Sequence, residues 1–165
     1  MESEVLFAEQ QRFNQVWIWV LLVMIDLSLL FGIYNHIVNK QKGNSVWIMN
    51  GALYISFLLV FAVTLIMFFS KLETTITKDA ITVRFFPLLL NTKVYTWDSI
   101  DQAVVRQYSP IGEYGGWGLR IGADGKAFNV SGDTGIQLVF KNGKKLLIGT
   151  NKGQEAANLL AALGK

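Results

Sequence analysis

Residues 47–69 read WIMNGALYISFLLVFAVTLIMFF, a run of 23 residues that contains no Asp, Glu, Lys or Arg. An α-helix rises about 1.5 Å per residue, so this run would form a helix about 34 Å long, and the hydrocarbon core of a bilayer is about 30 Å thick. We therefore predict a transmembrane helix over residues 47–69. The run decides the fold because it separates an apolar N-terminal part of the chain from a more polar C-terminal part.

A second apolar run, residues 16–34, precedes it and is just long enough to cross a bilayer. The link over residues 35–46 is short and polar, so the two predicted helices run antiparallel as a transmembrane hairpin over residues 16–69. Asp26 lies near the middle of the first run. A carboxylate at the centre of a bilayer costs about 2.5–3.5 kcal/mol, and we therefore expect Asp26 to face protein instead of lipid.

The depth of Asp26 indicates its partners in the second helix. If Tyr34 and Trp47, at the two ends of the link, lie at the same depth in the bilayer, Asp26 lies level with Tyr54 and Ser56. The hydroxyl groups of these two residues could donate hydrogen bonds to the Asp26 carboxyl group. Three roles stay open: a contact that holds the two helices together, a contact with another subunit, and proton or ion handling. The third role usually needs several ionisable groups, and the two runs contain one carboxylate.

The N-terminal segment, residues 1–15, starts acidic, whereas a signal peptide starts basic. We expect it to be retained and to form a helix at the membrane interface. Basic residues outside the hairpin outnumber Lys40 and Lys42 of the link. The positive-inside rule therefore favours both termini in the cytoplasm. We expect a multi-pass protein of the inner (cytoplasmic) membrane.

Composition excludes several classes of function. The net charge is +3, and the basic residues are scattered instead of clustered, so we expect no nucleic-acid binding. The chain has no cysteine and one histidine, His36, which leaves no disulfide, no thiolate nucleophile and no zinc site. We also expect no cofactor and no enzymatic activity, because no nucleophile, base or pair of carboxylates stands in a catalytic pattern.

Residues 71–165 change to short alternating runs, rich in β-branched and aromatic residues and separated by turn signals, which predict about seven antiparallel strands. Asn142-Gly143 is a strong hairpin turn, and the lysines around it are typical of a solvated turn. Ala156, Leu159, Leu160 and Leu163 recur at helical spacing and predict an amphipathic C-terminal helix.

The order of these elements resembles a known group of bacterial membrane proteins, in which two transmembrane helices precede a pleckstrin-homology-like (PH-like) domain. The resemblance rests on the paired apolar runs, the strand pair over 72–86, the segment TKVYTWDSI (92–100) and the helix over 153–164. It implies an α-helical membrane hairpin followed by an antiparallel β PH-like barrel over residues 71–165 with one C-terminal α-helix. The group is largely uncharacterised and carries over no catalytic residue.

One segment departs from this pattern: residues 108–118, YSPIGEYGGWG, are longer and richer in glycine than a plain barrel needs. In one interpretation the segment is a structural turn whose aromatic residues cap the barrel. In the other it is a recognition rim, because loops on a rigid scaffold often bind ligands. Tyr108, Tyr114 and Trp117 would then offer stacking surface, while Glu113 and Arg120 would select charge.

These patterns favour a membrane-tethered, non-enzymatic interaction module whose domain binds a protein, or weakly an anionic lipid, at the cytoplasmic face. Tethering raises the local concentration of the domain near such partners. The alternative is an accessory subunit of a larger membrane complex that binds through its transmembrane helices. The expected partners are the lipid bilayer and another membrane or membrane-proximal protein, and a homo-oligomer stays open.

Overall fold

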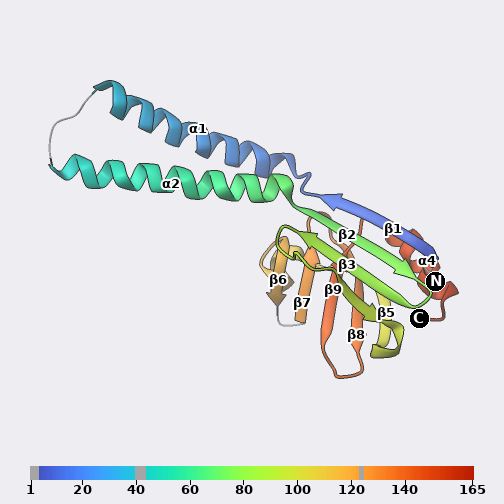
Figure 1. The fold of residues 1–165 in the computed structure, drawn as a ribbon. Helices are drawn as coiled ribbons and strands as arrows, with labels where there is room; N and C mark the ends of the chain where they lie inside the picture. Colours follow the sequence, from blue (N-terminus) through green and yellow to red (C-terminus); the bar gives the residue numbers. More distant parts are fainter. Residues whose placement is uncertain (1–3, 40–43, 123–124) are drawn as a thin grey trace. The chain divides into compact units, whose positions relative to one another are not determined.

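The computed structural model describes residues 4–39, 44–122 and 125–165. The chain forms two compact units (Figure 1). Residues Gln15–Phe69 form the helical unit, and Met1–Asn14 together with Ser70–Lys165 form the β domain. In the chain, the helical unit is therefore an insertion within the β domain and does not simply precede it.

The helical unit consists of α1 (Val16–Asn39) and α2 (Asn44–Phe69). Both helices are longer than predicted, since α1 continues beyond residue 34 and α2 begins before residue 47. No proline or glycine follows Tyr34 before the end of α1, so nothing in the sequence stops the helix at the predicted position. The consequence is a shorter connection between the helices.

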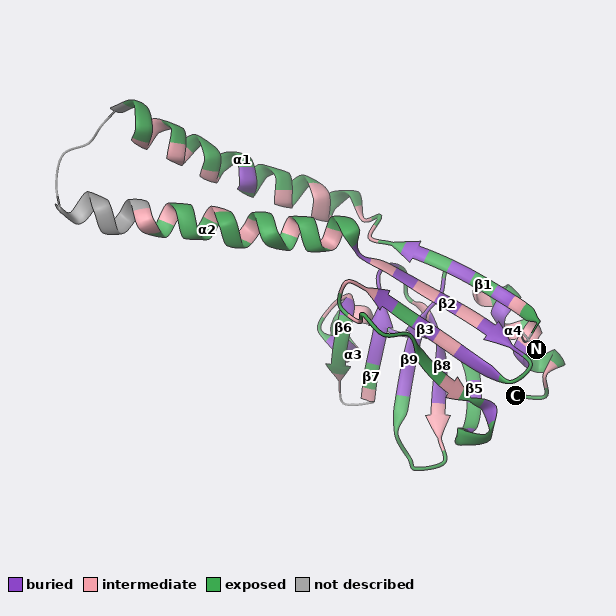
Figure 2. Cartoon of the chain, viewed as in Figure 1, coloured by how far each residue is buried: buried purple, intermediate pink, exposed green. Residues whose placement is uncertain are grey.

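Both helices are long and apolar enough to cross a membrane, by length and composition. Their large apolar side chains are mostly exposed or half-buried (Figure 2), including Phe31, Leu58 and Leu59. Such side chains stabilise a protein only when they leave water. The helical unit therefore needs an apolar environment that its own two helices do not supply.

The first sheet of the β domain has the order β1-β2-β3-β4, and every pair in it is antiparallel. The strands are β1 (Val5–Arg12), β2 (Lys71–Thr77), β3 (Ala80–Phe86) and β4 (Lys93–Thr96). The prediction of a helix in the N-terminal segment is wrong, because most of that segment is β1. Arg12 is the register partner of Lys71, so the two strands that flank the helical unit are paired with each other.

The second sheet has the order β5-β8-β9-β7-β6. Its pairs are antiparallel except for β7 and β9, which run parallel. The chain passes from the first sheet to the second through a short 3-10 helix, η1 (Trp97–Ser99). The remaining elements are β5 (Ile100–Gln107), α3 (Pro110–Tyr114), β6 (Gly118–Gly122), β7 (Gly125–Asn129), β8 (Thr134–Phe140), β9 (Lys145–Gly149) and α4 (Gly153–Ala162).

The two predicted apolar helices, the sheet-rich domain and the C-terminal helix are confirmed. The two sheets are not closed into the expected antiparallel barrel, and one strand pair is parallel. One hydrophobic core joins both sheets and α4, with Phe85 from β3, Leu138 from β8 and Leu160 from α4 among its buried residues. The end of β8 and the start of β9 flank the predicted turn at Asn142-Gly143.

β1 belongs to the β domain through polar contacts as well as backbone pairing. Its buried side chains are Phe7, Glu9 and Gln11. The Glu9 carboxylate accepts hydrogen bonds from the Thr150 hydroxyl (2.5 Å) and from the Asn151 backbone N–H (2.8 Å). The Gln11 side-chain amide donates to the carbonyl of Gly149, at 2.7 Å. The Glu9 carboxylate and the Gln11 amide nitrogen can be buried here because they find partners at the end of β9 and directly after it.

Candidate functional site

The glycine-rich segment folds as a one-turn helix, α3, instead of a simple bulged turn. Ser109 caps it by accepting a hydrogen bond from the Gly112 N–H, at 3.1 Å. Gly115 ends it in the left-handed conformation, with φ of +70°. A Cβ at Gly122 would lie 2.3 Å from the carbonyl oxygen of Glu113, so only glycine permits α3 to approach β6 this closely.

Tyr108 and Tyr114 are buried, with 5% and 4% of their surface exposed. Their rings meet edge to face at 6.0 Å, and they form a small second core with Ala127 and Leu147. The Tyr108 hydroxyl accepts a hydrogen bond from the Asn129 side chain at 2.9 Å, and burial raises the pKa of the Tyr108 phenol. The prediction that these two rings form an accessible stacking surface does not fit their burial.

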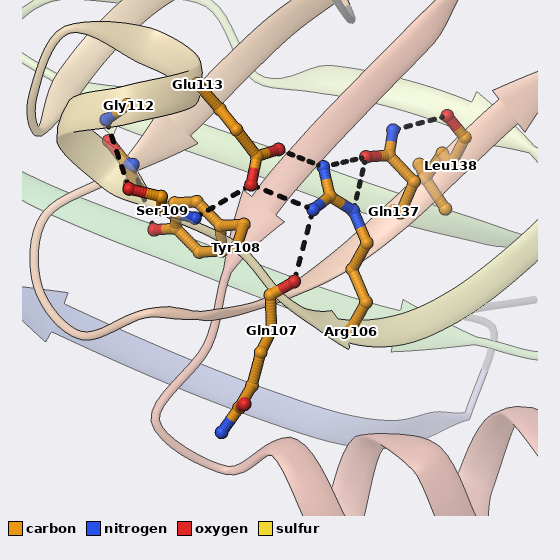
Figure 3. A network of polar contacts seen from close by, with 9 residues as sticks. Arg106, Gln107, Tyr108, Ser109, Gly112, Glu113, Gln137 and Leu138 are labelled. Atoms are coloured by element: carbon orange, nitrogen blue, oxygen red, sulfur yellow. Dashed lines mark hydrogen bonds and ion pairs between the residues drawn. The ribbon is translucent and has the colours of Figure 1, made fainter.

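Glu113 is held by Arg106 of β5 (Figure 3). The guanidinium contacts both carboxylate oxygens, at 2.7 and 3.3 Å, and also donates to the side-chain oxygen of Gln137. The Ser109 N–H donates to the same carboxylate at 2.8 Å. The hydrogen bond from Arg106 is the main cause that lowers the pKa of Glu113. This carboxylate therefore anchors α3 and is already neutralised within the domain.

Trp117 and Arg120 complete the predicted set. The Trp117 ring is half-buried, and its N–H donates to the carbonyl of Gly132 at 3.0 Å. Arg120 is exposed and donates to the carbonyl of Trp117 at 2.9 Å. The structure brings all five predicted residues into one region, but Tyr108, Glu113 and Tyr114 have structural contacts there. The interpretation of the segment as a structural cap accounts for these contacts.

Asp26 has a different partner from the one predicted. Its carboxylate accepts a hydrogen bond from the Thr64 hydroxyl at 2.9 Å, whereas Tyr54 and Ser56 are exposed. Thr64 lies roughly two and a half helical turns beyond the predicted level. The longer helices explain only a small part of this difference, because α1 gains five residues and α2 gains three at the link, which moves the expected level by two residues. The rest is a stagger between the two helices, which also brings His36 next to Tyr54. Asp26 is 9% exposed, which fits the role of a contact between the two helices.

The β domain also contains an open groove of about 680 Å³ that the sequence did not indicate. Its apolar lining comes from Tyr95 of β4, Phe140 of β8, Leu146 of β9 and Ile121 of β6. Ile121 is 79% exposed, which is unusual for a branched aliphatic side chain in a strand. The other lining residues are Ser99, Gly125, Lys126, Asn142, Gly143, Lys144 and Lys145.

The groove combines an apolar surface with positive charge. Lys126 is the register partner of both Ile121 and Leu146, so its ammonium group stands beside the apolar side chains. Lys144 follows the turn between β8 and β9. None of the described residues that line the groove is an Asp or a Glu. This arrangement fits a ligand that is apolar along one side and carries carboxylates.

Sequence reasoning missed this groove because its walls come from strands that are far apart in the chain. The alternation of Leu119 and Ile121 and the lysines of the β8–β9 turn were visible, but their proximity depends on the parallel pairing of β7 with β9. The described residues contain no group of three or more His, Cys, Asp or Glu that could hold a metal ion.

No protein-family model, curated protein or solved structure matches this chain. The resemblance to PH-like membrane proteins therefore stays a prediction. The roles of individual residues must be inferred from their contacts, burial and charge, and the groove is a feature of the described residues that is open to a ligand.

Proposed function

We propose that this protein is a bacterial membrane-anchored, non-enzymatic binding module with a PH-like β domain at the cytoplasmic face. The groove binds an extended, acidic and apolar segment of a membrane-proximal protein. The observation that carries the proposal is the pairing of exposed Ile121 with Lys126 and Lys144 in a groove whose described lining contains no carboxylate. Residues 108–118, which the sequence predicted as a recognition rim, have a structural role in this proposal, because they support the second sheet.

Membrane anchorage is supported by the position of the helical unit in the chain. The chain leaves the β domain after Arg12 and returns at Lys71, and these two residues are register partners. A hairpin of two crossings brings the chain back to the side from which it left, so β1 can pair with β2. Removal of α1 as a cleaved signal would also remove β1, with its buried Phe7 and Glu9. The positive-inside rule adds the cytoplasmic orientation.

The chemistry of the ligand follows from the lining. Apolar side chains of the ligand would cover Tyr95, Phe140 and Ile121 and remove apolar surface from water, which stabilises the complex. Carboxylates on the other side of an extended segment would meet the lysine ammonium groups, and such complementarity mainly supplies specificity and speed of association. β4 is the edge strand of the first sheet, so an extended segment could also pair with its backbone.

Binding of designed peptides tests the proposal. The full-length protein in nanodiscs is titrated with a fluorescent peptide of alternating Glu and Leu, and with a matched peptide of alternating Lys and Leu, while fluorescence anisotropy is recorded. We expect the acidic peptide to bind at least about tenfold more tightly, a difference of about 1.4 kcal/mol. The double variant Lys126→Glu with Lys144→Glu should reverse this preference.

The control is Lys141→Glu, a charge reversal at a neighbouring lysine that does not line the groove. It should leave the preference for the acidic peptide nearly unchanged. Equal binding of both peptides, or an unchanged preference in the double variant, would contradict the groove as the binding site.

The alternative function, an accessory subunit that binds through its transmembrane helices, has no comparable observation in its favour. It was suggested by Asp26, whose carboxylate faces Thr64 of the same chain. The contact of Asp26 with Thr64 therefore supports a role within the helical unit.

A further inference from the structure

The connection between β3 and β4, residues 87–92 (PLLLNT), exposes two leucines; we name it the leucine loop. Leu89 packs against the core, and its backbone N–H donates to the carbonyl of Phe85. Its neighbours Leu88 and Leu90 are 41% and 72% exposed. Anchoring of the middle leucine thus holds the two outer ones on the surface of the β domain.

The leucine loop lies at the end of the first sheet where the chain passes to and from the helices. Phe86, the residue before the loop, is the register partner of Lys71, and Lys71 is the partner of Arg12. Neighbouring strands lie about 4.8 Å apart, so the loop starts within about 10 Å of Ser70, the residue that follows α2. This proximity results from pairing within the β domain alone.

This end of the sheet also carries an excess of positive charge. Exposed Arg12, Arg84 and Lys93 lie on β1, β3 and β4, and Lys71 is the first residue of β2. One carboxylate, that of Glu73, lies 2.8 Å from Lys71 and 3.9 Å from Arg84. Apolar side chains surrounded by basic ones are typical of surfaces that enter the interface of an anionic bilayer.

We propose that Leu88 and Leu90 insert into the boundary between head groups and acyl chains, and that the surrounding basic residues contact anionic head groups. The bilayer is thereby a second ligand of the β domain, bound at a site separate from the groove. The β domain is covalently connected to the helical unit, and the insertion of the two leucines is a second attachment to the membrane. Two attachments restrict the orientation of the groove relative to the bilayer.

A depth measurement on the full-length protein tests this proposal. The chain contains no cysteine, so Thr92→Cys can carry a single environment-sensitive fluorophore next to the two leucines. The protein is placed in nanodiscs of phosphatidylcholine, with or without phosphatidylglycerol, that contain a lipid nitroxide quencher. A fluorophore at Asn142→Cys, in the β8–β9 turn, serves as the reference. We expect several-fold stronger quenching at residue 92, and a further increase with phosphatidylglycerol.

Proximity to the anchor could by itself cause some quenching, so a second variant separates the two causes. Leu88→Asn with Leu90→Asn should reduce quenching at residue 92 to near the reference value while leaving the thermal unfolding of the β domain nearly unchanged. Equal quenching at both positions, or quenching that is unaffected by the asparagine substitutions, would overturn the proposal. Binding of the acidic peptide to the groove should persist in this variant, so failure of one proposal is distinguishable from failure of the other.

Arg84→Gln with Lys93→Gln tests the contribution of charge separately. This variant should lose the increase that phosphatidylglycerol causes and keep the quenching seen in phosphatidylcholine alone. If phosphatidylglycerol increased the quenching in this variant as much as in the wild type, the part of the proposal that concerns anionic head groups would be overturned.

Discussion

The helical unit and the β domain use the same apolar residue types in opposite ways. In the β domain, Ile81, Phe85 and Leu138 have 0% of their surface exposed. In the helical unit, Leu58 and Leu59 are 64% and 63% exposed. The β domain therefore supplies its own apolar interior, whereas the helical unit depends on a surrounding apolar phase. A substitution of a large apolar residue should consequently have very different effects in the two units.

The largest difference is expected for truncation to alanine. Phe85→Ala removes a fully buried ring and should lower the free energy of unfolding of the β domain by about 3–5 kcal/mol. Leu58→Ala, in the helical unit, should leave the unfolding of the β domain nearly unchanged. Thermal unfolding of the detergent-solubilised protein, followed by circular dichroism of the sheets, measures both. Similar losses in the two variants would mean that the units do not fold separately.

A smaller effect is expected where β1 joins the β domain. Glu9→Ala leaves the buried Thr150 hydroxyl and the Asn151 N–H without their carboxylate partner, which costs about 1–3 kcal/mol. The same unfolding measurement detects it. Glu4→Ala is the matched control, because Glu4 contacts exposed Lys78 on the surface and should have no measurable effect. Equal stability of both variants would contradict the buried role of Glu9.

The smallest effect concerns pH. Arg106 lowers the pKa of Glu113, so the ion pair stabilises the folded domain above the ordinary pKa of a glutamate, about 4.3. That stabilisation is lost as the pH falls through the lowered pKa of the folded state. The difference in unfolding free energy between the wild type and Glu113→Gln should be at most about 1 kcal/mol at pH 7, because the pair is partly exposed, and should shrink on acidification.

The same series of unfolding measurements, repeated between neutral and acidic pH, gives the sign of this dependence. A difference that grows on acidification would contradict the role of Arg106 and Glu113 as an ion pair that anchors α3.

The contrast between the units also explains how far the sequence predicted the structure. The helices were predictable because long apolar runs with at most one charged residue have few alternatives, and the alternating runs after Lys71 indicated strands. β1 was not predictable, because it turns Glu9 and Gln11 inward, and their partners lie near Thr150 at the other end of the chain. A local pattern cannot reveal a polar residue that is buried by a distant one.

The candidate site shows the same limit. The glycine-rich segment identified the right region, but the burial of Tyr108 and Tyr114 depends on the short helix α3 and on its contact with Arg106. The groove depends on residues from five different strands, β4, β6, β7, β8 and β9. Turn residues and alternation can be recognised one segment at a time, whereas a surface built from several segments needs the complete sheet order.

Removal of the helical unit tests most directly whether the bilayer is its solvent. Asn14 is joined to Ser70 through two glycines, which makes a five-residue loop between the paired Arg12 and Lys71, a common length for a hairpin. We predict that the shortened protein is recovered without detergent, is rich in sheet and unfolds cooperatively, while the full-length chain stays with the membrane until detergent is added. A full-length chain that is soluble without detergent, or a shortened chain that fails to fold, would contradict this conclusion.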